Sequence, residues 1–203
     1  MALMKKLITY MHKPLNTIAD IRAGHTFRGR IEEDPAGNTP VVQIKDLKDQ
    51  AMLTVDRLPR IHWSSEKTGA RVIPAAQPGD ILLPARGEYY KASVLQGDEP
   101  VIATSQLFVL RLASNAITPA YLGWHLNQSA AQHYFLTHRS GTSMPMLNKQ
   151  SLGALPIVVP PLATQEKIVL LQRCWEQEKQ LTEQLLTNRE KMLKGIFQQL
   201  LEA

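Results

Sequence analysis

The stretch Leu155-Pro-Ile-Val-Val-Pro-Pro-Leu-Ala-Thr-Gln165 divides the chain into two parts of different composition. All 13 prolines, all six histidines and ten of the 11 glycines lie at or before Pro161. Residues 162–203 contain no proline and a single glycine, Gly195. We therefore predict a globular body over residues 1–161 and one long helix over residues 162–203.

Charge is distributed unevenly between these two parts. The 203-residue chain has 23 Lys and Arg against 18 Asp and Glu, a net charge of +5. The tail has six residues of each sign, so the whole excess belongs to the body. An apolar fraction of 44% is enough to build a core, which excludes a disordered chain. A basic body suits a polyanionic partner, although net charge alone is weak evidence for nucleic acid.

Three features of the sequence bear on where the protein is found in the cell. The N-terminal stretch Met1–Pro14 has no continuous apolar run, so we expect no secretory signal there. The weakly polar run Leu152–Ala163 is short and broken by prolines, which excludes a membrane span. Cys174 is the only cysteine, so no internal disulfide forms, and the cytoplasm is the expected compartment.

The body shows short apolar runs separated by turn residues, which predict strands. Thr118 and Pro119 open a helix expected to run to about Thr137, and Asn148 caps a shorter helix that ends near Gly153. The predicted fold class is α+β, with a mixed or antiparallel sheet. The predicted strands are Val41–Ile44, Ile81–Pro84, Ser93–Leu95, Leu107–Leu112 and Leu155–Val159.

The tail is predicted to be one helix with Thr164 as its N-cap, and an apolar seam runs along it. Glu178 and Thr182 interrupt this seam in its middle. The helix would measure about 55 Å, against a body diameter near ~40 Å, so we expect it to extend past the body and to pair with another helix. A helix kinked at its polar middle and folded back on the body is the alternative, which the lack of proline and glycine there disfavours. The seam consists of Ile168, Leu171, Trp175, Leu185, Met192 and Ile196.

Three loops combine cations with glycines, hydroxyls or aromatic rings: Gly24–Arg30, Arg86–Lys91 and His138–Ser143. Arginine offers a donor fork that matches guanine or phosphate, lysine supplies a point charge, and tyrosine can stack or donate to the DNA backbone. Each loop alone could be a turn with solvated charges, but three together favour DNA binding. The predicted DNA-binding residues are Arg28, Arg30, Arg86, Tyr89, Tyr90, Lys91, Arg139, Ser140 and Thr142.

Catalytic and metal sites are poorly supported. His125, His133 and His138 do not share a helix face, so a metal site there is not expected. Asp80, Glu88 and Lys91 are similar in type to the site of a metal-dependent nuclease, but Glu88 and Lys91 would point to opposite faces of a strand. The nuclease interpretation is therefore a minor alternative.

The second half of the body resembles the target-recognition domain of type I restriction-modification specificity subunits. The resemblance is carried by Ser140-Gly-Thr-Ser-Met-Pro-Met-Leu-Asn148, by Leu152, by the strand and Pro-Pro pair of Leu155–Pro161, and by Gln165 and Ile168 at the start of the helix. Less specific similarity covers Thr17–Gly29, Gly79–Leu83 with Arg86-Gly87, and Ser105-Gln106.

A full-length specificity subunit carries two such domains joined by two antiparallel helices. These helices set the distance between the halves of a split DNA site and dock the methyltransferase subunits. Methyl transfer from S-adenosylmethionine to adenine belongs to those partners and cleavage to a restriction subunit, so the resemblance implies a non-catalytic chain that holds no cofactor itself. This chain departs from the pattern because it has one domain and one helix. We expect a symmetric homodimer, joined through antiparallel tail helices, to read a palindromic split site.

Two other interpretations stay open at this point. The tail could belong to a coiled-coil adaptor whose body binds protein rather than DNA. The chain could also be one half of a longer subunit, which sequence alone does not separate from a natural half-length form.

Overall fold

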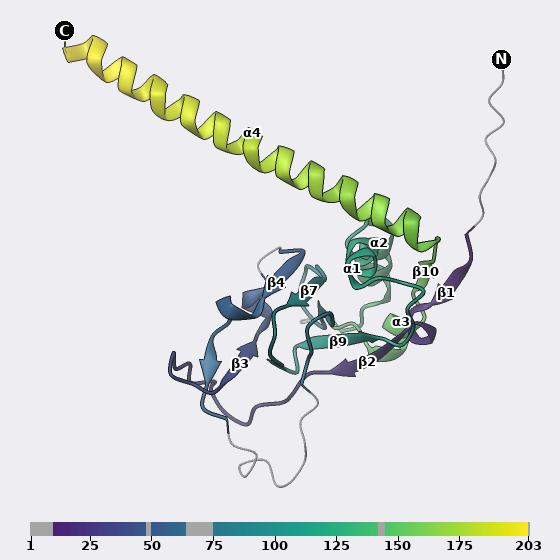
Figure 1. The fold of residues 1–203 in the computed structure, drawn as a ribbon. Coiled ribbons are helices and arrows are strands. Elements are labelled where there is room, and N and C mark those ends of the chain that lie inside the picture. Colours follow the sequence, from purple (N-terminus) through teal and green to yellow (C-terminus); the bar gives the residue numbers. More distant parts are fainter. Residues whose placement is uncertain (1–9, 48–49, 64–74, 142–144, 203) are drawn as a thin grey trace, which may run out of the picture. The chain divides into compact units, whose positions relative to one another are not determined.

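A computed structural model of the chain describes residues 10–47, 50–63, 75–141 and 145–202. The chain divides into two compact units, residues 1–162 and residues 163–203, which are described separately (Figure 1). Strands and short helices make up the first unit and a single helix makes up the second, which confirms the predicted α+β class with a long C-terminal helix.

A five-stranded mixed sheet forms the centre of the body. Its order is β2-β9-β6-β7-β4, and every neighbouring pair is antiparallel except β4 and β7. The predicted strands Ile81–Pro84 and Leu107–Leu112 are found with the expected bounds. The five strands are β2 (Ala19–Ala23), β4 (Met52–Thr54), β6 (Ile81–Pro84), β7 (Ser93–Gln96) and β9 (Leu107–Leu112).

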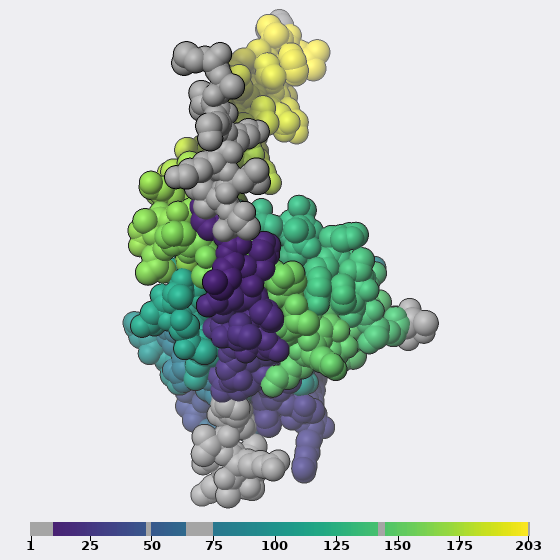
Figure 2. All heavy atoms as spheres, turned by 90° about the vertical axis from the view of Figure 1, so that its right-hand side faces the viewer, coloured from purple at the N-terminus to yellow at the C-terminus, as the bar shows by residue number. Residues whose placement is uncertain are grey.

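Two smaller sheets flank the central one. The first has the order β5-β3-β8, formed by Arg60–Ile61, Thr39–Val42 and Ile102–Ala103. The second pairs β1 (His12–Pro14) with β10 (Pro156–Val158), so the two ends of the body lie side by side (Figure 2, purple beside green). Three single-turn 3-10 helices complete the loops: η1 (Leu15–Thr17), η2 (Ile44–Asp46) and η3 (Val55–Arg57).

The strand predicted at Val41–Ile44 ends before its expected last residue. β3 stops at Val42 because Gln43 caps η2, with its backbone N–H donating to the Asp46 carboxylate at 2.8 Å. A capping box at this point turns the chain out of the strand after two buried valines.

Capping residues begin two of the three helices of the body as predicted. Thr118 Oγ1 accepts from the Tyr121 N–H at 3.2 Å at the start of α1 (Pro119–Leu126), and Asn148 Oδ1 accepts from the Ser151 N–H at 2.7 Å at the start of α3 (Lys149–Gly153). Both side chains satisfy a backbone donor that the first helical turn leaves unpaired.

The single helix predicted from Thr118 to Thr137 is wrong, because the chain breaks after Leu126 and resumes as α2 (Ser129–His138). Asn127 at the break exchanges two hydrogen bonds with the backbone of Ala92, donating to its oxygen at 2.9 Å and accepting from its nitrogen at 2.8 Å. These bonds tie the break to the loop before β7, an interaction over 35 positions that no local pattern reveals.

One hydrophobic core cluster lies against the central sheet and includes Leu53, Leu82, Leu95 and Val109 from its strands. The helix α1 packs against β7. A side chain at Gly123 would approach the Val94 side chain to 2.8 Å, so this glycine permits the close approach of helix and strand.

The second unit is the uninterrupted helix α4 (Leu162–Glu202), which has 41 residues and measures about 60 Å. It begins immediately after Pro161, so the prediction of Thr164 as N-cap is wrong. The helix continues through Glu178, Thr182 and Gly195 without a break, so the predicted alternative of a kink at its polar middle is not found. Among the described residues, no helix is both long and apolar enough to cross a bilayer.

Candidate nucleic-acid interface

The loops with the predicted DNA-binding residues begin at one end of the central sheet. Both β2 and β6 run antiparallel to β9, and their last residues, Ala23 and Pro84, pair with Phe108 and Leu107 at the start of β9. The loops that follow β2 and β6 therefore leave the sheet at the same end of its strands. The first of these carries Arg28 and Arg30, and the second carries Arg86 to Lys91.

The short segment Thr104–Gln106 connects these two loops. On one side, the Ser105 N–H donates to His25 O at 2.8 Å, and on the other the Ala85 N–H donates to Gln106 O at 2.8 Å. A Cβ atom at Gly24 would lie 2.2 Å from Thr104 O, so only glycine allows this approach.

The third predicted loop joins the same place through Met146. The Leu147 N–H donates to Ala85 O at 2.8 Å, and Met146 forms β-bridges with both Arg86 and Ser140. The Ser140–Met146 bridge has two reciprocal bonds of 2.8 Å. We call the described residues of the three loops and their connector, residues 24–30, 85–91, 104–106, 139–141 and 145–147, the sheet-end surface.

Most of the predicted DNA-binding side chains reach solvent on this surface. Arg28, Arg30 and Ser140 are exposed, and Tyr89 is 78% exposed. Arg86, Lys91 and Arg139 are partly buried. Thr142 lies outside the described residues. The surface thus combines guanidinium groups, an ammonium, a hydroxyl and an aromatic ring, which are the groups that contact phosphates and bases.

Tyr90 is a correction to the predicted set, because its side chain is fully buried. Its ring packs against Phe135 with centroids 5.8 Å apart, and Gln132 Nε2 donates to its backbone oxygen at 3.0 Å. Burial raises the pKa of the Tyr90 hydroxyl, and the neighbouring Arg139 guanidinium partly offsets the rise. The hydroxyl has no hydrogen bond of good geometry. Tyr90 therefore anchors the loop, and its exposed neighbour Tyr89 is the ring available to a ligand.

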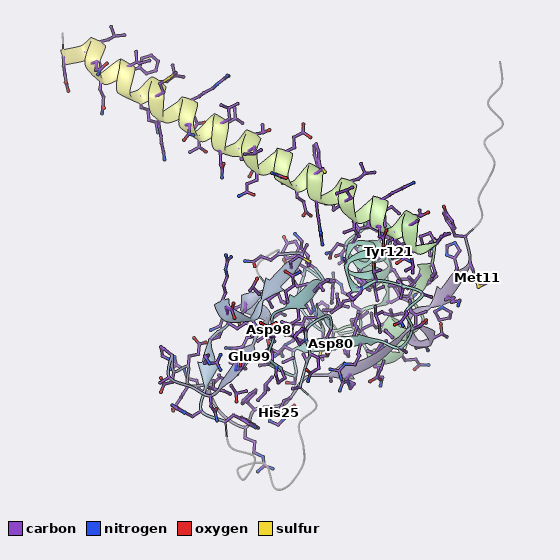
Figure 3. The ribbon with its side chains drawn as sticks, viewed as in Figure 1. Met11, His25, Asp80, Asp98, Glu99 and Tyr121 are labelled. Carbon is purple, nitrogen blue, oxygen red and sulfur yellow. The ribbon has the colours of Figure 1, made fainter. Side chains whose placement is uncertain are left out.

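The base of the first loop is an aromatic cluster that the sequence did not reveal. His25, Phe27 and Trp63 meet edge to face, with ring centroids 5.0 to 5.6 Å apart (His25 is labelled in Figure 3). Phe27 and Trp63 also cover the small core of the three-stranded sheet. Since Trp63 lies 36 positions after Phe27, only the fold brings them together. The cluster positions the backbone that leads to Arg28 and Arg30.

Two acidic groups close to the first loop have partners in the body. Glu33 forms an ion pair with Lys45, and Asp34 Oδ2 lies 3.0 Å from His62 Nε2, within hydrogen-bonding distance. Hydrogen bonds from the Lys45 ammonium and from the Ala36 N–H, respectively, lower the pKa values of these two carboxyls. Pairing reduces the repulsion that these carboxylates would exert on a polyanion bound near the loop.

Ser105 and Gln106 are further candidates for base contact that the sequence prediction left out. They lie between the first two loops, with Ser105 exposed and Gln106 partly buried. A glutamine side chain can donate to and accept from an adenine edge in the major groove. The sequence signals for this pair were its polar character between two apolar strands and its place in the family resemblance.

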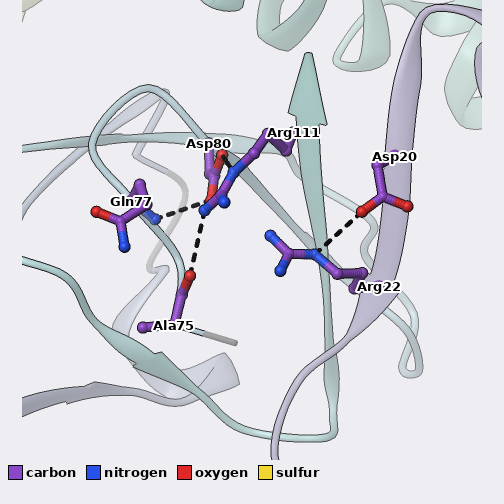
Figure 4. A network of polar contacts seen from close by, with 6 residues as sticks. All are labelled: Asp20, Arg22, Ala75, Gln77, Asp80 and Arg111. Carbon is purple, nitrogen blue, oxygen red and sulfur yellow. Dashed lines mark hydrogen bonds and ion pairs between the residues drawn. The ribbon is translucent and has the colours of Figure 1, made fainter. Parts of the chain in front are cut away.

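The structure does not bring together the two carboxylates of the nuclease alternative. Asp80 precedes β6 and Glu88 follows it, so the two carboxylates lie at opposite ends of a strand. Asp80 is buried and accepts from Arg111 Nε at 2.9 Å, from Arg111 Nη2 at 2.7 Å and from the Gln77 N–H at 2.8 Å (Figure 4). The hydrogen bond to Asp80 in turn raises the pKa of Arg111. Asp80 therefore links the start of β6 to β9 through its ion pair with Arg111.

Two of the three helical histidines have separate local contacts. His125 Nε2 accepts from the Val158 N–H at 3.3 Å, and burial lowers its pKa. His138 stacks on Tyr134 with centroids 3.8 Å apart. Over the described residues, no group of three His, Cys, Asp or Glu side chains is arranged to hold a metal ion.

The predicted pairing residues of α4 form an exposed apolar stripe. Trp175, Leu185, Met192 and Ile196 are between 41% and 59% exposed, and Leu171 is 70% exposed. Ile168 is partly buried. Exposed apolar side chains in such a run mark an interaction surface.

Comparison with solved structures shows proteins of similar fold. A structure described as "Structural basis underlying complex assembly and conformational transition of the type I R-M system" matches with a TM-score of 0.69 and 21% identity over 92% of this chain and 43% of that one. The HsdS subunit from Thermoanaerobacter tengcongensis matches with a TM-score of 0.57 and 22% identity, over 83% of this chain and 37% of that one. The S subunit from M. genitalium matches with a TM-score of 0.54 and 11% identity, over 87% of this chain and 41% of that one.

The family model of the type I restriction modification DNA specificity domain matches residues 8–187, and the chain belongs to this family. It spans less than half the length of each solved protein that it matches here. The comparison with curated proteins found no significant match.

Proposed function

We propose that this chain is a non-catalytic reader of double-stranded DNA that directs a partner adenine methyltransferase to its target sequence. S-adenosylmethionine is then bound by the partner, and a restriction subunit is a further candidate partner. Host DNA as the ligand implies action in the cytoplasm.

The observation that carries this proposal is the convergence of three loops on one sheet end. Arg28 and Arg30 arrive from the loop after β2, Arg86 and Tyr89 from the loop after β6, and Arg139 from the segment after α2. Surfaces that combine guanidinium groups with small polar donors contact phosphates for register and base edges for sequence. Membership of the DNA specificity domain family supports the same reading.

We further propose that two copies act together. One target-recognition body reads one half-site, and a symmetric pair of bodies reads two inverted half-sites. The exposed apolar stripe of α4 supports pairing through this helix, because a stripe of this kind is stabilised when another helix covers it.

The test has two parts. In vitro, the full chain is titrated with a 30-base-pair duplex at several salt concentrations, and phosphate contacts predict that log K falls by about 0.9 per contact for each tenfold rise in salt. In the host, the chain is copurified with its methyltransferase and methylated adenines are mapped. A split, palindromic methylated motif supports the proposal.

A protein-binding adaptor is the second candidate, favoured by the apolar stripe of α4 alone. It predicts no DNA affinity, or affinity without salt dependence. Either result would favour the adaptor function over DNA reading if deletion of the gene for this chain also left genome methylation unchanged.

A further inference from the structure

Two opposite charges interrupt the apolar stripe of α4. Positions three and four residues apart define the stripe, and Glu178 and Arg189 both fall on it, Glu178 between Trp175 and Thr182 and Arg189 between Leu185 and Met192. Both side chains are exposed. The stripe runs through Ile168, Leu171, Trp175, Glu178, Thr182, Leu185, Arg189, Met192, Ile196 and Gln199.

The two charges do not neutralise each other within one helix. They are 11 residues apart, which separates them by about 16 Å along the axis. If another helix covers the stripe, each charge enters a contact surface and needs an opposite charge from the partner, because an unpaired charge in such a place is costly.

Charge decides the direction of pairing between two copies. In a parallel, in-register pair, Glu178 faces Glu178 and Arg189 faces Arg189, so like charges meet twice. In an antiparallel pair, residues before the midpoint face residues after it, and Glu178 can face Arg189. Only the antiparallel arrangement is therefore compatible with the charges of this helix.

Charge also decides the register. When Thr182 faces Leu185 of the second copy, Glu178 faces Arg189, Trp175 faces Met192 and Leu171 faces Ile196, each twice by symmetry. The outermost layers then place Ile168 opposite Gln199.

A slip of one heptad in either direction separates the charges. In one direction Arg189 faces Leu171 and Glu178 faces Thr182. In the other direction Arg189 faces Leu185 and Glu178 faces Ile196. Both slipped registers leave two unpaired charges of each sign against uncharged layers.

We propose that α4 binds α4 of a second copy in the antiparallel Thr182–Leu185 register, selected by two symmetric Glu178–Arg189 ion pairs. This inference rests on the pairing of two copies proposed above and adds the residues that set its geometry. In this register, each helix runs about 32 Å from Leu162 to the midpoint, so the two helix starts lie about 65 Å apart. A slip of one heptad changes this distance by about 10 Å, or about three base pairs of DNA. The two ion pairs would therefore fix the distance between the two helix starts.

Cysteine cross-linking of the full chain tests the register. In a background with Cys174→Ser, the pair Leu171→Cys and Ile196→Cys should give a covalent dimer with a short thiol cross-linker. Neither single variant should do so, because antiparallel pairing keeps identical positions far apart. The matched control is Trp175→Cys with Leu185→Cys, which would face each other only after a slip of one heptad.

Each outcome has a defined meaning. Cross-linking of the first pair alone supports the proposal. Cross-linking of the control pair instead overturns the register, and cross-linking of the single variants overturns the antiparallel direction. A chain that stays monomeric at 100 μM in sedimentation equilibrium overturns the second copy as occupant and leaves the stripe to a different protein.

Charge reversal tests the role of the ion pairs. Glu178→Arg alone or Arg189→Glu alone places like charges opposite each other twice, and the dimer dissociation constant should rise roughly tenfold or more. The double variant should return to within about threefold of the parent. Glu176→Arg and Lys191→Glu make the same changes of charge outside the stripe and should leave the dissociation constant unchanged. A double variant as weak as the single ones would overturn the pairing.

DNA binding separates the failure of this inference from the failure of the proposed function. Salt-dependent binding to one half-site without the first cross-link retains the reader and rejects the register. The first cross-link without DNA affinity retains the register and rejects the reader.

Discussion

Tyr89 and Tyr90 are neighbours in sequence with opposite environments, so truncating each in turn separates DNA contact from folding. Tyr89 is 78% exposed on the sheet-end surface, whereas Tyr90 is fully buried against Phe135. Removal of a buried aromatic ring costs about 3–5 kcal/mol, a large part of the 5–15 kcal/mol typical of a whole domain. We expect Tyr90→Ala to lose about this much stability and to lower Tm by roughly 10 °C.

Tyr89→Ala should leave the unfolding free energy within about 0.5 kcal/mol of the parent. Its DNA affinity should fall severalfold or more, because the exposed ring is the one that a bound duplex can contact. Urea unfolding followed by fluorescence measures the stability, and fluorescence anisotropy with a duplex carrying the methylated motif measures the affinity.

Tyr90→Phe provides the matched control for the buried position. The Tyr90 hydroxyl lacks a hydrogen bond of good geometry, so its removal should change stability by less than about 1 kcal/mol. The reasoning is refuted if Tyr90→Ala unfolds at the same urea concentration as the parent. It is equally refuted if Tyr89→Ala loses stability but keeps its DNA affinity.

Three further predictions follow from single contacts. Asp80→Asn should lower the unfolding free energy by about 1–3 kcal/mol, less than the loss of a fully buried ion pair, because the Arg111 side chain is 39% exposed. The affinity of the folded variant for a DNA half-site should not change. A loss of that affinity would contradict a purely structural role for Asp80. Arg139→Ala should reduce the slope of log K against log salt by about one, measured by anisotropy, and an unchanged slope would remove it from the phosphate contacts. Burial and the nearby His12 lower the pKa of His125 below 6.5, so the unfolded chain binds more protons below that pH and the unfolding free energy should fall as pH drops from 7 to 5. His125→Gln should flatten this decline in urea midpoint, and an equally steep decline in the variant would show that another group is responsible.

Local patterns were sufficient for much of the framework. Thr118 and Asn148 were recognised as helix caps because a cap depends on a side chain and an N–H only three residues apart. The strands Ile81–Pro84 and Leu107–Leu112 were predicted to the residue because turn signals bound them closely. The family resemblance rested on the segment Ser140–Ile168, where several such elements follow in a fixed order.

Long-range pairing decided the points at which prediction failed. The break at Asn127 depends on the backbone of Ala92, and the buried position of Tyr90 depends on Phe135. Asp80 was assigned to a catalytic alternative because its partner, Arg111, lies 31 positions away on β9. Each of these partners is too far away in the sequence for a pattern of neighbouring residues to reveal it.

The sequence by itself indicated the change of composition at Pro161, the long continuous helix and the loops that carry cations. These properties follow from composition and from spacings of a few residues, which act on the backbone locally. Only the tertiary structure decided that the three loops share one end of the sheet and which of two adjacent tyrosines faces solvent. Those outcomes depend on the strand order β2-β9-β6, whose antiparallel pairing joins residues up to about 90 positions apart in the chain.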